Sequence, residues 1–427
     1  MVWPHRLSSG QSPCGYRIGR MLFRGFTPVL LLLSPLRGAN SNVFNEFNID
    51  PQAAEEEDNP YWESSMRLLW ADILKILAIL GVILLHVSAP LLVPFENSRQ
   101  WWIGNIYDSL TRWCVPLFVM VSGALVLHQS AQAPLRHFYF LRVRRILVPF
   151  LVWSAVYFFY RIHVKGDALA PSGFFRMLLT EPIYYHLWFV YMLIILYLLA
   201  PAAGAFLNYS PRKYTWYLIA LWVIWASVLP IIDKPLPFDT YFTPDMDDYS
   251  ALRLSGYFLL GYMLRDFHVR SGGKRSMVLL AFLAGAGGTV FGTYWISRER
   301  GEFHPFFYKY FSITVLAMSL GLFVLVKSIF NTRREITAGG DERIRMNSPK
   351  ILQQVGMSVF GIYLVHALVL ELLRDGRLSF TIDHTSAFGI EISPALGLPM
   401  FALSIFGFSL VAVFVLRLIP IVRDLVT

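Results

Sequence analysis

The chain has 427 residues, of which 56% are hydrophobic and only 15% are charged, and its formal net charge is +9. A soluble chain of this length would form roughly two or three domains, but the apolar composition predicts a single bundle of membrane-spanning helices. The positive charge does not indicate nucleic-acid binding, because cytoplasmic loops rich in Lys and Arg explain it in a membrane protein. The two cysteines, Cys14 and Cys114, predict neither a disulfide framework nor a metal site.

The first 65 residues do not fit this pattern. Several arginines precede a short apolar run at 26–36, and an acidic patch follows at 55–58. A cleaved signal peptide has this appearance, but its removal would reverse the first span, which the later loops contradict. We expect residues 1–65 to be a disordered extension or the product of an upstream start codon. Residues 66–427 are then the membrane domain.

Ten apolar segments follow, each close to the length that a bilayer requires. They are 68–92, 107–127, 146–164, 186–207, 214–232, 252–268, 277–297, 308–330, 355–373 and 395–421. The sixth is the weakest match, because it is short and contains Gly256 and Gly261. The predicted fold is an all-α polytopic membrane protein, a bundle of about ten transmembrane helices.

Loop charges predict the orientation of the bundle. Positive residues gather in the even-numbered loops, among them Arg136, Arg142, Arg144, Arg145, Arg212, Lys213, Arg265, Lys274, Lys327 and Lys350. Cytoplasmic loops carry this excess. We therefore expect both termini in the cytoplasm and the odd-numbered loops in the periplasm or outside the cell.

The first span carries three polar residues on one helix face. Lys75 and His86 are eleven residues apart, which is about three turns and about 16 Å along the axis, and Asp72 precedes Lys75 by three residues. Charged groups in hydrocarbon are costly and usually functional. We predict that His86 is a catalytic base and that Lys75, with Asp72, attracts an anionic donor. The alternatives are a core histidine with a satisfied ring and a structural Lys75–Asp72 ion pair.

Arginines mark two further candidate sites. Arg142 and Arg145 precede the third span, and their planar guanidinium groups suit a phosphate clamp, although anchoring at the cytoplasmic interface also explains them. Arg112 begins the second span and either reaches the outer interface or faces the bundle to stabilise negative charge. Ser122 and Gly123 allow a slim ligand to approach closely, or serve helix packing.

Aromatic and histidine side chains supply the remaining candidates for substrate binding. His186 and Trp188 open the fourth span, and His366 lies within the ninth. Either histidine could support the catalytic site or be a simple core residue. The outward loops hold aromatic residues near carboxylates, which suits a sugar ligand or a membrane interface; they are Trp101, Trp102, Tyr241, Phe242 and Tyr249.

Together these residues resemble the acyltransferase-3 family of membrane O-acyltransferases, on the branch of the enterobacterial common antigen acetyltransferase. The resemblance covers about residues 66–420. The family's basic-residue-x10-His motif falls on Lys75 and His86, and its Arg-x-x-Arg motif falls on Arg142 and Arg145. Further similar stretches read VPLFVMVSG, RRILVPFLVWS, YHLWFVYMLIILYL, GYFLLGYML and FGIYLVH. The branch generally lacks the 65-residue leader, and no second catalytic domain is expected.

The resemblance implies a bundle in the bacterial inner membrane that takes an acyl group, usually acetyl, from cytoplasmic acyl-CoA. The acceptor would be a hydroxyl of a surface glycan or its lipid-linked precursor. Acyl-CoA is then a co-substrate, and no permanently bound cofactor, metal or nucleic acid is expected, while a homo-oligomer stays open. His86 would deprotonate the acceptor or carry the acyl group itself. The other hypotheses are a transporter or flippase for a lipid-linked glycan and a non-catalytic partner in glycan assembly.

Overall fold

The structure is a computed structural model that describes residues 68–130, 134–233, 251–267, 269, 271–330, 334–336, 342–344, 349–375, 386–387 and 390–419. The predicted extension at residues 1–65 lies outside the described residues. So do three of the predicted sugar-binding aromatic residues, Tyr241, Phe242 and Tyr249.

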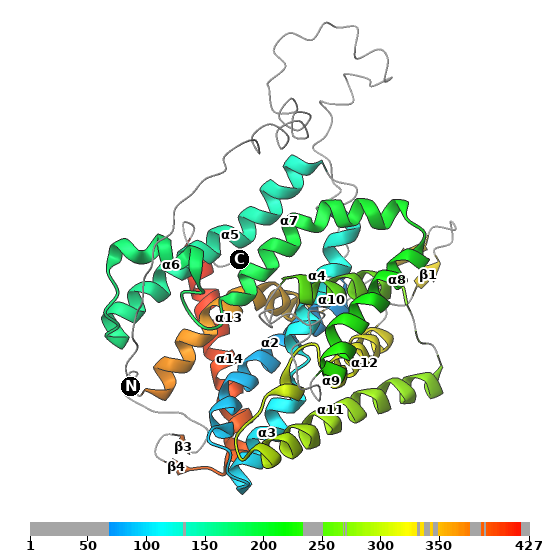
Figure 1. Ribbon diagram of the computed structural model, residues 1–427. Helices are drawn as coiled ribbons and strands as arrows, with labels where there is room; N and C mark the ends of the chain where they lie inside the picture. The colour runs from blue at the N-terminus through cyan, green and yellow to red at the C-terminus, as the bar shows by residue number, and fades with distance from the viewer. Residues whose placement is uncertain are drawn as a thin grey trace, which may run out of the picture. The chain divides into compact units, whose positions relative to one another are not determined.

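The described residues are almost entirely helical, which confirms the predicted fold class (Figure 1). The helices are α2 Leu69–Ser88, α3 Arg99–Thr111, α4 Cys114–Ser130, α5 Leu135–Tyr160, α6 Phe174–Thr180, α7 Trp188–Tyr209, α8 Arg212–Val223, α9 Leu229–Asp233, α10 Ala251–Leu264, α11 Gly272–Arg300, α12 Ile313–Ile329, α13 Lys350–Arg374 and α14 Pro394–Leu418. Two π-helical turns, Arg161–Lys165 and Ile224–Val228, extend α5 and α8. Two antiparallel hairpins pair β1 Arg334–Ile336 with β2 Glu342–Ile344, and β3 Ser386–Ala387 with β4 Ile390–Glu391.

Within the described part of the chain, 9 helical segments are long and apolar enough to cross a membrane. They correspond to nine of the ten predicted spans, with α3 and α4 together forming one segment over residues 99–130. The predicted sixth span differs. Its helix, α10, has 14 residues, or about 21 Å, which is shorter than a hydrocarbon core of about 30 Å. One face of α10 is buried against α4 and α8 inside the bundle.

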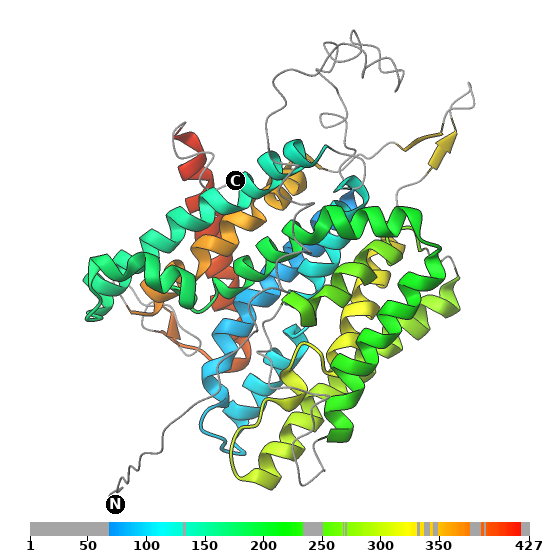
Figure 2. The ribbon, with the colours of Figure 1, turned by 45° about the horizontal axis from the view of Figure 1, so that its top comes forward.

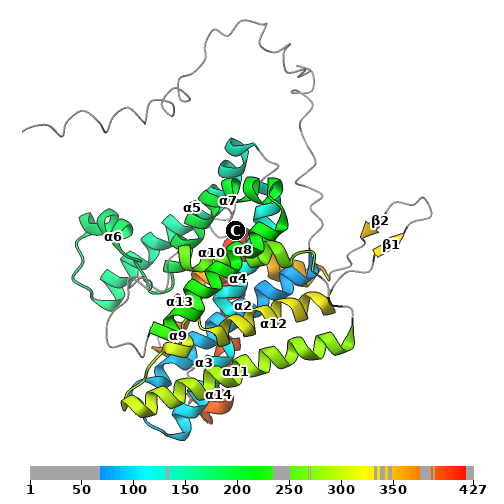
Figure 3. The same ribbon diagram turned by 45° about the vertical axis from the view of Figure 1, so that its right-hand side comes forward.

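Helix α2 lies at the centre of the described bundle. It packs against α13, α14, α4, α3 and α12, and the ribbon shows it between the α13–α14 pair and α4 (Figure 2). Helix α7 covers α4 and α5, while α11 runs along α12 at the edge (Figure 3). Any polar side chain on the buried faces of α2 is therefore enclosed by protein.

Glycines bring α4 and α10 into close contact. A Cβ on Gly123 would lie 1.9 Å from the Phe258 carbonyl oxygen, and one on Gly261 would lie 1.8 Å from the Met120 carbonyl oxygen. Only residues without a side chain allow two helix backbones to approach this closely, as is common where membrane helices pack. This contact fixes α4, whose first residue, Cys114, borders the site described next.

Candidate active site

His86 lies near the end of α2 and is half-buried. Its ring stacks on that of His366 from α13, with 5.6 Å between ring centroids, and meets the Tyr185 ring edge-on at 4.9 Å. The two histidines are 280 residues apart in the sequence, and they meet because α2 packs along α13. The structure thus brings together the predicted base and His366, which the sequence offered as a support of the catalytic site or a substrate contact, or as a core residue.

His366 is fully buried, and a backbone hydrogen bond orients its ring. Its Nδ1 atom lies 2.6 Å from the Tyr363 carbonyl oxygen. Because a carbonyl can only accept, Nδ1 carries the hydrogen and the neutral ring keeps its lone pair on Nε2. The Nε2 atom has no hydrogen-bond partner among the described residues. The His366 ring is therefore fixed in orientation beside His86, and its Nε2 atom makes no hydrogen bond with the described residues.

His186, just before α7, completes a cluster of three histidines. Its ring is buried 5.0 Å from His366 and 5.0 Å from Tyr157, and its carbonyl accepts a hydrogen bond from the Tyr363 hydroxyl. Burial lowers the pKa of the His186 imidazole well below its usual range, and the neighbouring His366 and His86 rings lower it further. His186 is thus neutral at physiological pH. The described residues contain no group of histidines, cysteines and carboxylates arranged to hold a metal ion.

Arg112, at the end of α3, faces the bundle and not the outer interface. Its side chain is 15% exposed and pairs with the fully buried carboxylate of Asp108. The guanidinium lies over the Tyr308 ring, 4.1 Å from its centroid, and is near enough to His86 to interact electrostatically. The Tyr308 hydroxyl in turn donates a hydrogen bond of 2.6 Å to the Asn105 side chain. A buried, oriented cation therefore stands beside the histidine cluster.

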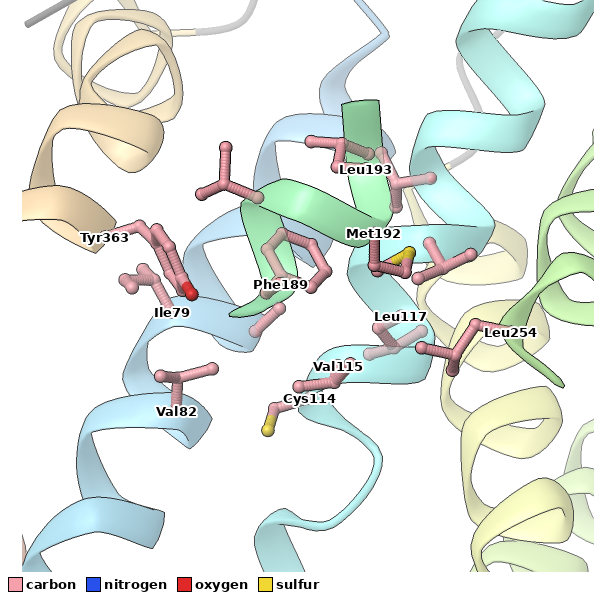
Figure 4. Close-up of a cluster of buried hydrophobic side chains, with 14 of the residues drawn as sticks. Ile79, Val82, Cys114, Val115, Leu117, Phe189, Met192, Leu193, Leu254 and Tyr363 are labelled. Carbon is pink, nitrogen blue, oxygen red and sulfur yellow. The ribbon is translucent and has the colours of Figure 1, made fainter. Parts of the chain in front are cut away.

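A small cavity of about 30 Å3 opens between these elements. Its polar walls are His86 and His186, and the rest is largely apolar: Val82, Leu85, Cys114, Val115, Phe118, Trp188, Phe189, Tyr310 and Tyr363. Figure 4 labels five of these side chains, Val82, Cys114, Val115, Phe189 and Tyr363, which come from α2, α4, α7 and α13. We call this space the His86 cavity. It has room for one or two water molecules.

The structure separates Lys75 and Asp72 from His86. Lys75 forms an ion pair with Asp72 at 2.6 Å, and its ammonium also lies 3.5 Å from the Gly356 carbonyl oxygen. The Asp72 carboxylate fills the space beside Gly356, where a Cβ would meet it at 2.7 Å. Eleven residues of helix place Lys75 about 16 Å from His86. The geometry matches the structural ion pair that the sequence left as an alternative.

The predicted donor-binding residues lie along α4 and the start of α5. Arg142 donates a hydrogen bond to the Gln129 side chain at the end of α4, whereas Arg145 is exposed. Ser122 lies beside Tyr197 of α7, and Arg142 interacts with the same tyrosine. Gly123 instead faces α10, and the α10 backbone fills the space that a side chain at this position would need. The structure thus links Arg142, Ser122 and Tyr197 but gives Gly123 a packing role.

The predicted aromatic contacts fall at two places. Trp188 lines the His86 cavity and stacks on Tyr310, with 5.9 Å between ring centroids. Trp101 is buried and donates a hydrogen bond to the Leu92 carbonyl oxygen at 3.2 Å, while Trp102 bonds Asn97 at 3.0 Å. Both tryptophans fasten the connection between α2 and α3. Neither lines the His86 cavity.

Comparison with protein families decides the assignment. The acyltransferase-3 family, described as an acyltransferase domain, matches residues 68–418. The chain belongs to this family. No characterised protein and no solved structure in the comparisons matches the chain significantly.

For a member of the acyltransferase-3 family, a multi-pass membrane acyltransferase is the general function. The matched range includes every predicted site residue from Asp72 to His366. It also includes three residues that the sequence did not single out, namely Asp108, Tyr185 and Tyr308. Asp108 had a detectable signal, because it precedes Arg112 by four residues and so shares its helix face. Tyr185 and Tyr308 had none, since only tertiary contacts bring them to the site.

Proposed function

We propose that this membrane acyltransferase moves an acetyl group from cytoplasmic acetyl-CoA to a sugar hydroxyl of a surface glycan or its lipid-linked precursor, in the inner membrane of a bacterium. One observation carries the proposal: the His86 ring borders a small apolar cavity and stacks on the oriented His366 ring. Acyl transfer needs a base beside the space where the acyl group reacts. The resemblance to the enterobacterial common antigen branch supports the sugar acceptor.

In this mechanism His86 acts as the general base. It takes the proton of the sugar hydroxyl while the hydroxyl oxygen attacks the thioester carbonyl, so that a C–O bond forms. The C–S bond then breaks, and the protonated imidazole returns the proton to the departing CoA thiolate. An acyl-imidazole on His86 is the alternative route, and it would leave labelled protein when no acceptor is present.

The neighbouring groups suit the charges that arise during this reaction. His366, held by the contact of its Nδ1 atom with the Tyr363 carbonyl oxygen, packs face to face on the His86 ring and so positions it. Arg112 can stabilise the oxyanion of the tetrahedral intermediate, because it is buried and already oriented by Asp108 and Tyr308. A hydrogen-bond donor that is already in place before the reaction, such as the Arg112 guanidinium, needs no reorganisation as the oxyanion forms. These roles use residues from α2, α3 and α13, all of which contact the central helix or form it.

A partly exposed stripe of α4 supports the donor's path. Phe118, Ser122, Leu125 and Gln129 recur at helical spacing, and all four are partly exposed on a helix that is otherwise mostly buried. The stripe runs from the His86 cavity, which Phe118 lines, to the Arg142–Gln129 contact. From Phe118 to Gln129 it covers about 16 Å. The pantetheine arm of CoA would follow this stripe, with its phosphates at Arg142 and Arg145.

The size of the His86 cavity favours a short acyl group. Its volume of about 30 Å3 is enclosed by side chains from four helices, among them Cys114 and Val115. A two-carbon acyl group requires a small local adjustment, whereas a long chain would displace packed side chains. Packed membrane interiors resist such rearrangement. Acetyl is therefore the proposed group.

The experiment compares the wild type with His86→Ala in detergent, using labelled acetyl-CoA and a lipid extract of the producing membranes as acceptor source. We expect CoA thiol release to fall by about a hundredfold or more, because general-base catalysis contributes at least that much. His163→Ala is the matched control, since this exposed histidine stacks on Phe159 and does not line the His86 cavity. A folded His86→Ala protein with the wild-type rate would refute the proposal.

A further inference from the structure

A second pocket lies next to the histidine cluster, and no predicted site residue lines it. It has a volume of about 280 Å3 and is formed where the end of α5 meets the segment before α7. Its walls are Arg161, Lys165, Asp167, Pro182, Ile183, Tyr184 and Tyr185. We call it the Tyr184–Tyr185 pocket. It is large enough for a small ligand, whereas the His86 cavity is not.

One aromatic ring joins this pocket to the candidate base. Tyr185 lines the pocket, and its ring centroid lies 4.9 Å from that of His86. The neighbouring Tyr184 stacks on Tyr157 at 4.5 Å, and the Tyr157 hydroxyl donates a hydrogen bond of 2.7 Å to the Leu364 carbonyl oxygen on α13. The same helix carries His366. Through Tyr157, the pocket residue Tyr184 is therefore held against α13, the helix that carries His366.

The charged groups at this pocket are balanced. Arg161 pairs with Asp167 at 2.6 Å and also donates to the Ile183 carbonyl oxygen at 3.1 Å. Lys165 forms ion pairs with Glu371 and with Asp375, the latter at 3.4 Å. Each cation lining the pocket therefore has a carboxylate partner. The walls offer many donors and acceptors but no unpaired positive charge for a phosphate.

Tyrosine faces and paired polar groups together suit a sugar. A pyranose ring has apolar C–H faces, which pack on aromatic rings, and a rim of hydroxyls that need both donors and acceptors. Burial, with the nearby Glu371 carboxylate, raises the pKa of the Tyr184 hydroxyl, so this group stays protonated and its oxygen can accept a hydrogen bond from a sugar hydroxyl. Of the residues that line the pocket, Tyr185 contacts the His86 ring.

We infer that the Tyr184–Tyr185 pocket is the acceptor site, which binds a neutral pyranose and presents one of its hydroxyls to His86. This inference rests on the proposed function and adds the place and the chemistry of its acceptor. The sugar enters from the end of α5 opposite to Arg142. Donor and acceptor thus approach the histidine cluster from different ends of the bundle.

Two variants of the pocket test the inference, each with a matched control. Asp167→Ala removes a carboxylate acceptor, and Pro182→Trp fills space at an exposed wall residue. Asp266→Ala removes the carboxylate of another Asp–Arg pair, 3.5 Å from Arg212, and Pro211→Trp changes another exposed proline. Two rates are measured with labelled acetyl-CoA: thiol release without acceptor, and label transfer to glycan in the membrane lipid extract.

We expect both pocket variants to lower label transfer about tenfold or more: Asp167→Ala because one charged hydrogen bond is lost, and Pro182→Trp because the indole occupies space that the sugar needs. Thiol release without acceptor should stay at the wild-type rate, and both controls should behave as wild type in both assays. Neutral methyl glycosides should inhibit transfer, whereas inorganic phosphate at the same ionic strength should not.

Other results would overturn the inference in distinguishable ways. Wild-type transfer by Asp167→Ala and Pro182→Trp would place the acceptor elsewhere, and equal loss of both rates would make the pocket a structural support. Inhibition by phosphate alone would assign an anionic ligand. Thiol release by the wild type without any labelled glycan would remove the sugar acceptor but keep the donor half of the proposed function. Absence of both rates in the wild type would refute the proposed function itself.

Discussion

The Arg112–Asp108 pair shows how a charged residue can be kept inside this bundle. The Asp108 carboxylate is fully buried and the Arg112 side chain is 15% exposed. Each charge would be costly to bury alone, and the pair is tolerated because the partners and the Tyr308 ring compensate one another. A pair of this kind often adds little net stability. Its position beside His86 favours a role in catalysis over one in folding.

Substitutions at this pair can separate the two roles. Asp108→Leu alone should destabilise the protein by about 3–5 kcal/mol, because it leaves the Arg112 cation buried without its partner. The double variant Asp108→Leu/Arg112→Met should recover most of this loss, since no buried charge remains. Its turnover should nevertheless fall by about a hundredfold, as expected when an oxyanion-stabilising donor is removed.

Thermal unfolding in detergent and thiol release from acetyl-CoA measure the two effects on the same preparations. A double variant that regains both stability and wild-type turnover would show that Arg112 serves only as the partner of Asp108. The proposed role of Arg112 at the oxyanion would then be wrong.

At the level of helices, the α4–α10 contact leaves no room for a side chain at its glycines. Gly123→Ala would place a Cβ 1.9 Å from the Phe258 carbonyl oxygen, so the two helices would have to separate. We expect a loss of about 1–3 kcal/mol, the usual cost of overpacking. Gly287→Ala on α11 is the control, because its Cβ would meet nothing within 4 Å. That variant should gain about 0.5–1 kcal/mol from helix propensity.

Thermal unfolding of the two glycine variants decides between packing and ligand approach at Gly123. Equal stability of Gly123→Ala and the wild type would contradict the close contact. Gly123→Ala with normal stability but weaker acetyl-CoA binding would instead return Gly123 to the donor site predicted from the sequence.

Hydropathy alone was sufficient to predict most elements, because a bilayer demands long apolar helices. Nine predicted spans correspond to helical segments of suitable length. The predicted sixth span differs, because the described helix there, α10, has 14 residues, which alone are too few to span a bilayer, and its glycines serve a close contact with α4. Hydropathy also missed most of α3. Arg99–Thr111 contains both apolar and polar residues, and some of the polar ones form a buried hydrogen-bond network.

The candidate site was predictable only in part, for a related reason. His86 and Lys75 share a helix face, so local periodicity was enough to single them out. The sequence could not show that His366 stacks on His86 or that Tyr185 touches it, because those contacts join separate helices and loops. Helix rise also placed Lys75 about 16 Å from His86 along the axis, but the sequence could not show that Lys75 pairs with Asp72 beside Gly356 of α13.

For the whole molecule, the arrangement suggests transfer between the two sides of a membrane. The Arg142–Gln129 contact and the Tyr184–Tyr185 pocket lie toward opposite ends of α5, with about 28 Å of helix between Arg142 and Arg161. The proposed donor route reaches the histidines from one end and the proposed acceptor route from the other. This requires the Arg142 end in the cytoplasm, as the loop charges predict.

Single cysteines test this orientation in intact cells or sealed spheroplasts. Ala168→Cys lies in the exposed segment after α5, and Lys213→Cys lies at the exposed start of α8. Both are made in a Cys14→Ser background, while Cys114 stays because it is buried. A membrane-impermeant maleimide should label Ala168→Cys directly. It should label Lys213→Cys only after the membrane is permeabilised.

The reverse labelling pattern would place the Tyr184–Tyr185 pocket in the cytoplasm, where acetyl-CoA is found, and the Arg142 end outside. The arginines could then no longer bind a cytoplasmic donor, and the two substrate routes would have to be exchanged. Labelling of both cysteines without permeabilisation would require an even number of membrane crossings between them. Helix α7, at 22 residues the one described helix of bilayer length between these positions, would then not cross the membrane alone. Because α7 carries Trp188 and Phe189 into the His86 cavity, either result would change the mechanism as well as the topology.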